Sequence, residues 1–210
     1  MPVTPPAGIQ PRLAEPSRLE ELNAHAAALP WIEVEDRTAS DLELLGNGGF
    51  TPLKGFLGKA DYESVVKDMR LADGQVWSIP ITLPLRREEA ARLPEGSDVA
   101  LRFRGRNVAI LHLREKYDYD REAEARNVWR TTDPAHPGVA ALMRQGEVYL
   151  GGEVVVLASD IHTDFGEYRF TPTQTRAIFK ERGWERVGWT WGDGGKAVTG
   201  WSPLAVATPG

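Results

Sequence analysis

Cysteine is absent from this chain of 210 residues. Its absence excludes disulfides, thiolate metal sites and a cysteine nucleophile, and it fits a reducing compartment. No apolar stretch approaches the roughly 20 residues that a membrane-spanning helix needs. The start of the chain also lacks the basic residues and apolar run of a secretory signal. We therefore expect a cytoplasmic protein with no membrane partner.

Basic residues are fewer than acidic ones. Lysine and arginine number 25 against 30 aspartate and glutamate residues, which gives a net charge of -5. Nucleic-acid-binding proteins neutralise phosphates with lysine and arginine, so a nucleic-acid partner is not expected. The hydrophobic content of 41% and charged content of 26% are ordinary for a globular chain with a sizeable core.

The order of apolar and polar residues predicts strands scattered among helices. Residues 1–16 hold five prolines and predict an extended N-terminal arm. Val99, Leu101 and Phe103 alternate with other residues and are followed by a turn over 104–107, which predicts a hairpin. The apolar segment 147–157 is interrupted by glycines and predicts a pair of strands. Without regular strand–helix–strand repeats, this pattern indicates an α+β or barrel-like domain.

Helix signals are clearest at three places. Ser40 with Glu43 forms a capping-box pattern that predicts a helix over 40–45, ended by the glycine-rich residues 46–49. A second helix is expected over 60–69. Thr171 followed by Pro172 predicts the start of another helix, which Gly183 ends.

The loop Gly-Asn-Gly-Gly at 46–49 is the first candidate binding feature. Exposed backbone N–H groups in such loops bind anions. This loop follows a helix rather than a strand, however, and no Lys-Ser or Lys-Thr comes after it, so it does not fit the known nucleotide patterns. A structural loop is the favoured interpretation.

Four segments resemble one known family. They are residues 41–74, which include LELLGNGGFTPLKGFLG at 42–58, residues 77–83, residues 131–139 with 146–152, and residues 171–187. In this order they are similar to ATP sulfurylases (sulfate adenylyltransferases) over about residues 15–187. The resemblance implies that residues 17–170 form that family's N-terminal domain, a PUA-like β-barrel with peripheral helices. It also implies that residues 171–187 begin the linker or catalytic domain, whereas 188–210 are a tail that does not match the family.

The family joins ATP and sulfate into adenosine phosphosulfate and pyrophosphate with the help of Mg²⁺. Arginine and histidine donors suit that reaction because they neutralise charge on the leaving pyrophosphate. The family supplies them from Gln-x-Arg-Asn and His-x-x-His motifs, and this sequence contains neither. We therefore predict no catalytic, cofactor-binding or metal-binding residue in this chain, and no sulfate adenylylation by the chain alone. The expected partner is a missing catalytic domain or a catalytic partner chain.

Four loop residues are candidates for a domain interface or for a position beside the active site: Asn47, Phe50, Asp133 and His136. Loops carry functional residues more often than strands do. For His136 the competing interpretation is that it fixes a turn. Asp160, His162 and Asp164 alternate and could share one face as metal ligands, but a hydrophilic loop is the favoured interpretation there.

The rival hypothesis is a stand-alone binding or assembly module that docks onto a protein or binds RNA. The arginines around Phe103, which are Arg102, Arg104, Arg106 and Arg114, would serve RNA. A solvated hairpin or an interdomain salt-bridge surface explains them as well. The tryptophan-rich tail is consistent with a truncated reading frame or with an ending evolved for another role. The sequence leaves the oligomeric state open.

Overall fold

A computed structural model describes residues 8–164, 166–184, 188–189 and 203–204. The chain divides into two compact units, Met1–Asp164 and Phe165–Gly210. Most of the expected tail at 188–210, and the first residues of the expected N-terminal arm, lie outside the described residues. Among the described helices, none has the length and apolar character needed to cross a membrane.

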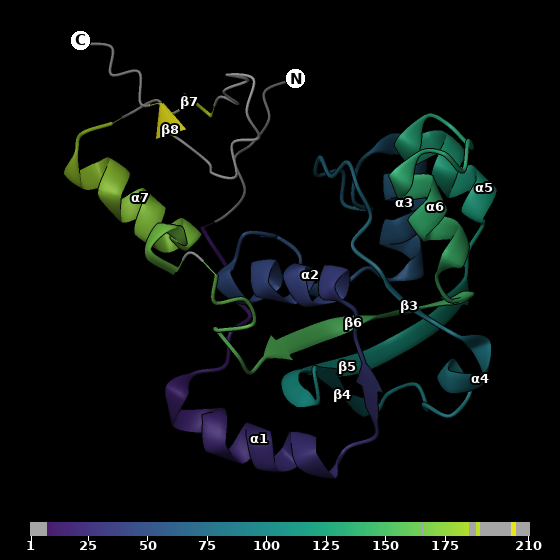
Figure 1. Ribbon diagram of the computed structural model, residues 1–210, viewed down its shortest axis with the longest axis horizontal. Coiled ribbons are helices and arrows are strands. Elements are labelled where there is room, and N and C mark those ends of the chain that lie inside the picture. Colours follow the sequence, from purple (N-terminus) through teal and green to yellow (C-terminus); the bar gives the residue numbers. More distant parts are fainter. Residues whose placement is uncertain (1–7, 165, 185–187, 190–202, 205–210) are drawn as a thin grey trace. The chain divides into compact units, whose positions relative to one another are not determined.

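The first unit is built on a mixed sheet of six strands (Figure 1). The strands are β1 (Trp31–Glu33), β2 (Gly55–Phe56), β3 (Leu83–Leu85), β4 (Asp98–Phe103), β5 (Arg106–Asp118) and β6 (Val148–Val156). Their order is β1-β4-β5-β6-β2, and β3 also pairs with β6. All pairings are antiparallel except β1 with β4. The α+β class is confirmed, but among the described residues the sheet is not closed into the expected barrel.

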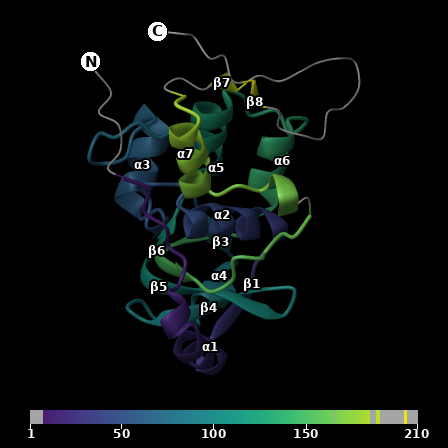
Figure 2. The ribbon, with the colours of Figure 1, turned by 90° about the vertical axis from the view of Figure 1, so that its left-hand side faces the viewer.

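Helices cover both faces of this sheet. On one side, η1 (Pro16–Arg18) leads into α1 (Leu19–Ala28), which contacts β4 and β5; on the other side, α2 (Asp36–Asn47) contacts β6 (Figure 2). The remaining helices of the unit gather beyond one end of α2, apart from α4, which lies near β3. They are α3 (Lys59–Asp68), α4 (Arg87–Ala90), α5 (Arg121–Glu124), η2 (Ala125–Trp129, a π-helical turn) and α6 (Pro137–Arg144).

The alternation of side chains along the strands separates two cores. Val99, Leu101 and Phe103 of β4 enter the main core with Leu42 and Leu45 of α2. On the opposite face, Ala100 and Ile110 pack with Ala26 of α1 in a smaller core. Successive strand residues point to opposite faces of a sheet. The alternation expected from the sequence therefore places Val99, Leu101 and Phe103 in one core and Ala100 in the other.

The hairpin between β4 and β5 is tighter than expected. Arg104 and Gly105 alone form its loop, with φ angles of +53° and +75°. Two successive residues with positive φ are typical of the type I′ turn, whose twist matches that of the two strands. The prediction of a hairpin here is confirmed, whereas its four-residue turn is wrong.

Residues 148–156 form one strand rather than the predicted pair. The glycines within it mark close approaches instead of a turn. A Cβ added at Gly152 would lie 2.1 Å from the carbonyl oxygen of His112 on β5, and one added at Gly151 would lie 2.9 Å from Gly58. A glycine inside a strand often has this meaning, because another backbone comes too near for a side chain.

The second unit contains α7 (Pro172–Glu181), preceded by η3 (Gly166–Tyr168). The hydroxyl of Thr171 accepts from the backbone N–H of Gln174, whose side chain accepts in turn from the N–H of Thr171. Gly183 has a φ of +66° after the helix end. The local signals at both ends were therefore predicted correctly. No residue of α7 is buried. The strands β7 (Gly188–Trp189) and β8 (Pro203–Leu204) pair with each other.

Candidate functional site

Asn47 and Phe50 lie where α2 ends. Gly48 has a φ of +82°, and the side-chain oxygen of Asn47 accepts from the N–H of Gly49 at 2.9 Å. Phe50 is half-buried and meets the ring of Trp77 edge-on, with 5.7 Å between ring centroids. The two candidate residues thus share one loop, in which Asn47 shapes the backbone and Phe50 faces a second aromatic.

The N–H groups of this loop are already used within the protein. Gly48 donates to the carbonyl of Leu45, and Phe50 donates to that of Leu44. Thr51 donates to the carbonyl of Gly48, while Gly49 donates to Asn47. An anion-binding nest needs free N–H groups that point to a common centre. The loop therefore has the hydrogen bonding of a structural turn, in agreement with the favoured interpretation.

Asp133 and His136 shape the start of α6. The Asp133 carboxylate accepts from the N–H of Ala135 at 2.8 Å, and its carbonyl accepts from the N–H of His136. The Nδ1 atom of His136 accepts from the N–H of Gly138 at 3.2 Å, and its ring lies 5.4 Å from that of Trp129. The His136 side chain therefore caps the first turn of α6, which is the geometry of a turn-fixing histidine.

The structure keeps the two candidate pairs separate. Asn47 and Phe50 follow α2, whereas Asp133 and His136 precede α6, and no hydrogen bond, ion pair or ring contact between described residues joins them. A role for Asp133 and His136 beside an active site stays a prediction.

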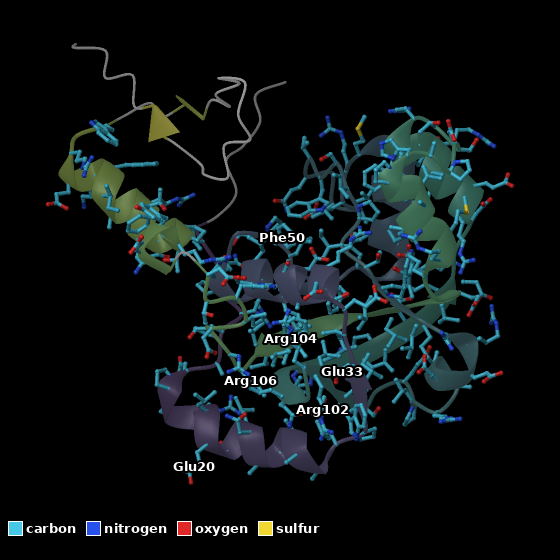
Figure 3. The ribbon with its side chains drawn as sticks, viewed as in Figure 1. Glu20, Glu33, Phe50, Arg102, Arg104 and Arg106 are labelled. Carbon is cyan, nitrogen blue, oxygen red and sulfur yellow. The ribbon has the colours of Figure 1, made fainter. Side chains whose placement is uncertain are left out.

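Three arginines of the hairpin, Arg102, Arg104 and Arg106, are labelled in Figure 3, and each contacts a neighbouring group. Arg104 lies 3.3 Å from the Asp36 carboxylate, and Arg106 makes two 3.0 Å bonds to the Asp160 carboxylate. Arg102 donates to Asn107 and lies over the exposed ring of Trp31, 4.5 Å from its centroid. Phosphate binding would have to compete with these carboxylates.

Arg114 lies apart from the other three arginines. It lines a hollow of about 450 Å³, together with Glu115 and Glu153. The hairpin borders another hollow of about 380 Å³, lined by Glu33, Glu35 and Asp36 among others. Acidic side chains beside both hollows disfavour a polyanion, so the geometry does not favour the RNA-binding hypothesis.

Asp160 and His162 have different partners. Asp160 binds Arg106, whereas Nδ1 of His162 lies 2.8 Å from the Glu43 carboxylate. Over the described residues, no group of three histidine, aspartate or glutamate side chains has the arrangement of a metal site.

A buried glutamate among tyrosines escaped the sequence analysis. Glu124 is 5% exposed, and its Oε2 accepts from the hydroxyls of Tyr62 and Tyr149, each at 2.9 Å. Burial raises the pKa of Glu124, and these two hydrogen bonds partly offset the rise. Tyr119 stacks on Tyr149 with 3.7 Å between centroids. In the sequence Glu124 stands among other charged residues over 120–126, so nothing there indicated its burial.

A second missed cluster joins α1 to the sheet. The Asp98 carboxylate lies 3.0 Å from Nε2 of His25 and 2.5 Å from Nδ1 of His112. Burial acts to raise the pKa of Asp98, but hydrogen bonds from the two histidines lower it below its usual value. The three residues are far apart in sequence, and their contact depends on the pairing of β4 with β5.

A family comparison defines the class of this protein. The model of the PUA-like domain matches residues 4–159. The chain therefore belongs to the family of PUA-like domains, in agreement with the mixed sheet and its helices.

Comparisons with individual proteins narrow this class. The chain is 50% identical over 176 residues to a sulfate adenylyltransferase of Symbiobacterium thermophilum, covering 83% of this chain and 44% of that protein. It is 46% identical over 177 residues to a probable bifunctional SAT/APS kinase 2 of Sorangium cellulosum, covering 84% of this chain and 30% of that protein. The resemblance to sulfate adenylyltransferases is confirmed, and the chain spans less than half the length of these relatives.

A solved structure has a similar fold. The hexameric APS kinase from Thiobacillus denitrificans superposes with a TM-score of 0.65 at 31% sequence identity. The match covers 85% of this chain and 31% of the other. The fold described here thus recurs as one part of a larger chain.

Proposed function

We propose that this chain supplies the PUA-like part of a sulfate adenylyltransferase in sulfate assimilation, and that it does not catalyse the reaction alone. One observation carries the proposal. The chain is 50% identical to a sulfate adenylyltransferase over a segment that makes up 44% of that protein. The Gln-x-Arg-Asn and His-x-x-His motifs expected for the reaction do not occur in its 210 residues.

The contacts of the described residues support the proposal that catalysis needs groups outside this chain. Adenylyl transfer to sulfate needs cations that neutralise charge on the triphosphate. Arg104 and Arg106 are instead paired with carboxylates, and His136 accepts a backbone hydrogen bond. In the proposed complete enzyme, ATP and Mg²⁺ bind to residues outside this chain. We place the protein in the cytoplasm, where ATP is available.

Assembly is a further part of the proposal. The similar APS kinase of Thiobacillus denitrificans is described as hexameric, and the Sorangium relative as bifunctional. We therefore propose that the partner of this chain is a catalytic domain or catalytic chain, within an oligomer.

The first test is an assay of the purified 210-residue chain for sulfate-dependent release of pyrophosphate from ATP and Mg²⁺. We expect no release above the rate without protein. Turnover that requires both sulfate and this chain would contradict the proposal.

The second test is a chimera. The matched 176-residue segment of the Symbiobacterium sulfate adenylyltransferase is replaced by the corresponding residues of this chain. We expect the chimera to keep activity within about tenfold of the parent, because about half of the replaced residues are identical. A parent protein lacking the segment is the negative control. A folded chimera without activity would argue against the proposed function.

A further inference from the structure

Exposed apolar side chains are concentrated in one part of the first unit. Residues 8–164 contain six large hydrophobic side chains that are exposed, and four of them lie at the end of α2 or in the segment after α3. With two half-buried aromatic residues they form the apolar patch: Leu44, Phe50, Met69, Val76, Trp77 and Ile79. Larger contiguous patches of this kind mark interaction sites on soluble proteins.

Hydrogen bonds and a ring contact connect the residues of the patch. Phe50 donates its N–H to the carbonyl of Leu44 and meets the ring of Trp77 edge-on. Trp77 donates its backbone N–H to the carbonyl of Met69 at 3.0 Å and its indole N–H to that of Ile79 at 2.8 Å. Figure 3 shows Phe50 beside α2.

Further hydrogen bonds order the chain just before Val76 and Trp77. The N–H of Leu71 donates to the carbonyl of Gln75, and the N–H of Gly74 donates to the carbonyl of Leu71, so residues 71–75 form a closed turn. An interface that is ordered before binding loses less conformational entropy when the partner arrives.

We propose that the apolar patch binds the part of a sulfate adenylyltransferase that this chain does not match. This inference rests on the proposed function. The length of the relative identifies the binding partner. The matched segment makes up 44% of the Symbiobacterium protein, so more than half of that protein lies outside the match and has to pack against the matched domain. The surface that it offers to the patch is apolar, because the six patch residues carry no charge.

Titration calorimetry measures the binding of the full 210-residue chain to a probe. The probe is the part of the Symbiobacterium sulfate adenylyltransferase that this chain does not match. The patch variant is Val76→Asp with Ile79→Asp, at side chains that are 53% and 44% exposed. The control is Leu13→Asp with Trp31→Asp, whose side chains are 42% and 53% exposed but lie outside the patch. Circular dichroism verifies that the probe and each variant are folded.

We expect the patch variant to weaken binding at least tenfold and the control to change it less than twofold. Equal binding by the patch variant and the wild type, or no binding by the wild type, would overturn the inference. Light scattering of the chain alone gives a further outcome: a dimer that the patch variant dissociates would mean that a second copy occupies the patch. If the chimera is active while the patch variant binds normally, the proposed function stands and only the patch assignment fails.

Discussion

The helices α2 and α7 belong to different units and are stabilised by different interactions. The helix α7 has a capping box at Thr171, proline at its first position and Gly183 after its end, yet it buries no residue. In α2 no side chain caps the first turn, yet five residues are buried. Tertiary packing supplies most helix stability in proteins, whereas caps contribute about 1 kcal/mol each. Strong local signals therefore do not indicate which helix is held by a core.

The largest expected effect lies in the core under α2. Leu42→Ala removes a side chain that is 0% exposed, and it should lower the free energy of unfolding by about 2 to 5 kcal/mol. Ile178→Ala on α7 is the matched change, expected below about 0.5 kcal/mol because no residue there is buried. Urea denaturation of both variants measures the difference. Similar losses would mean that α7 is packed as firmly as α2.

The buried carboxylate should come next. Tyr149→Phe removes one of the two hydroxyls that Glu124 accepts, and it should cost about 1 to 3 kcal/mol because a buried acceptor loses a partner. The pKa of Glu124 should rise further, since the remaining hydrogen bond offsets burial less. Tyr168→Phe, at a side chain that is 73% exposed, is the control and should change nothing measurable. Equal stability of the two variants would refute a structural role for the cluster.

Asp41 on α2 gives a prediction about pH. Burial raises its pKa from the ordinary 3.8 to about 6, with Arg37 opposing the rise. Between these two pKa values the folded protein binds the proton more tightly than the unfolded chain. The contribution of Asp41 to stability therefore falls as pH rises from about 4 to above 6.

Asp41→Asn should accordingly raise the free energy of unfolding by about 1 to 2 kcal/mol at pH 7.5 and by much less at pH 4. Thermal unfolding at the two pH values tests this. Asp73→Asn is the comparison, because hydrogen bonds from Gln75 lower the pKa of Asp73, so this variant should not stabilise. A gain for Asp41→Asn that is the same at both pH values would rule out the titration as its cause.

The smallest effect should be at the cap of α7. Thr171→Ala removes the hydroxyl that accepts from Gln174, at a cost of about 1 kcal/mol confined to the helix. Amide hydrogen exchange over residues 172–176 should become faster, while exchange in β5 stays unchanged. Faster exchange in β5 as well would show that the loss extends to the first unit and that the two units are energetically coupled.

Several elements could be predicted because their signals are local. The β4–β5 hairpin followed from alternation, and the end of α2 from Gly48. The start of α2 was predicted wrongly. Ser40 was expected to cap a helix, but it lies inside α2, where its hydroxyl donates to the carbonyl of Asp36. The Gly151 and Gly152 pair was interpreted as an interruption, although it allows close strand pairing.

The candidate sites show the same limit. Phe50 was selected from its loop, and the structure places it against Trp77. Glu124 was not selected, since a glutamate in a charged helix gives no sign of its tyrosine partners. The contact of Asp98 with His25 and His112 likewise requires residues that are 73 and 14 positions away.

The amino-acid sequence by itself determined the family, the absence of its reactive motifs, the α+β class and the ends of several helices. These depend on residue identity and on neighbours a few positions apart. Only the tertiary structure decided that the sheet stays open over the described residues, that Glu124 is buried, and that Leu44, Trp77 and Ile79 share one exposed patch. Burial and contact depend on which distant segments meet, and sequence spacing alone does not contain that information.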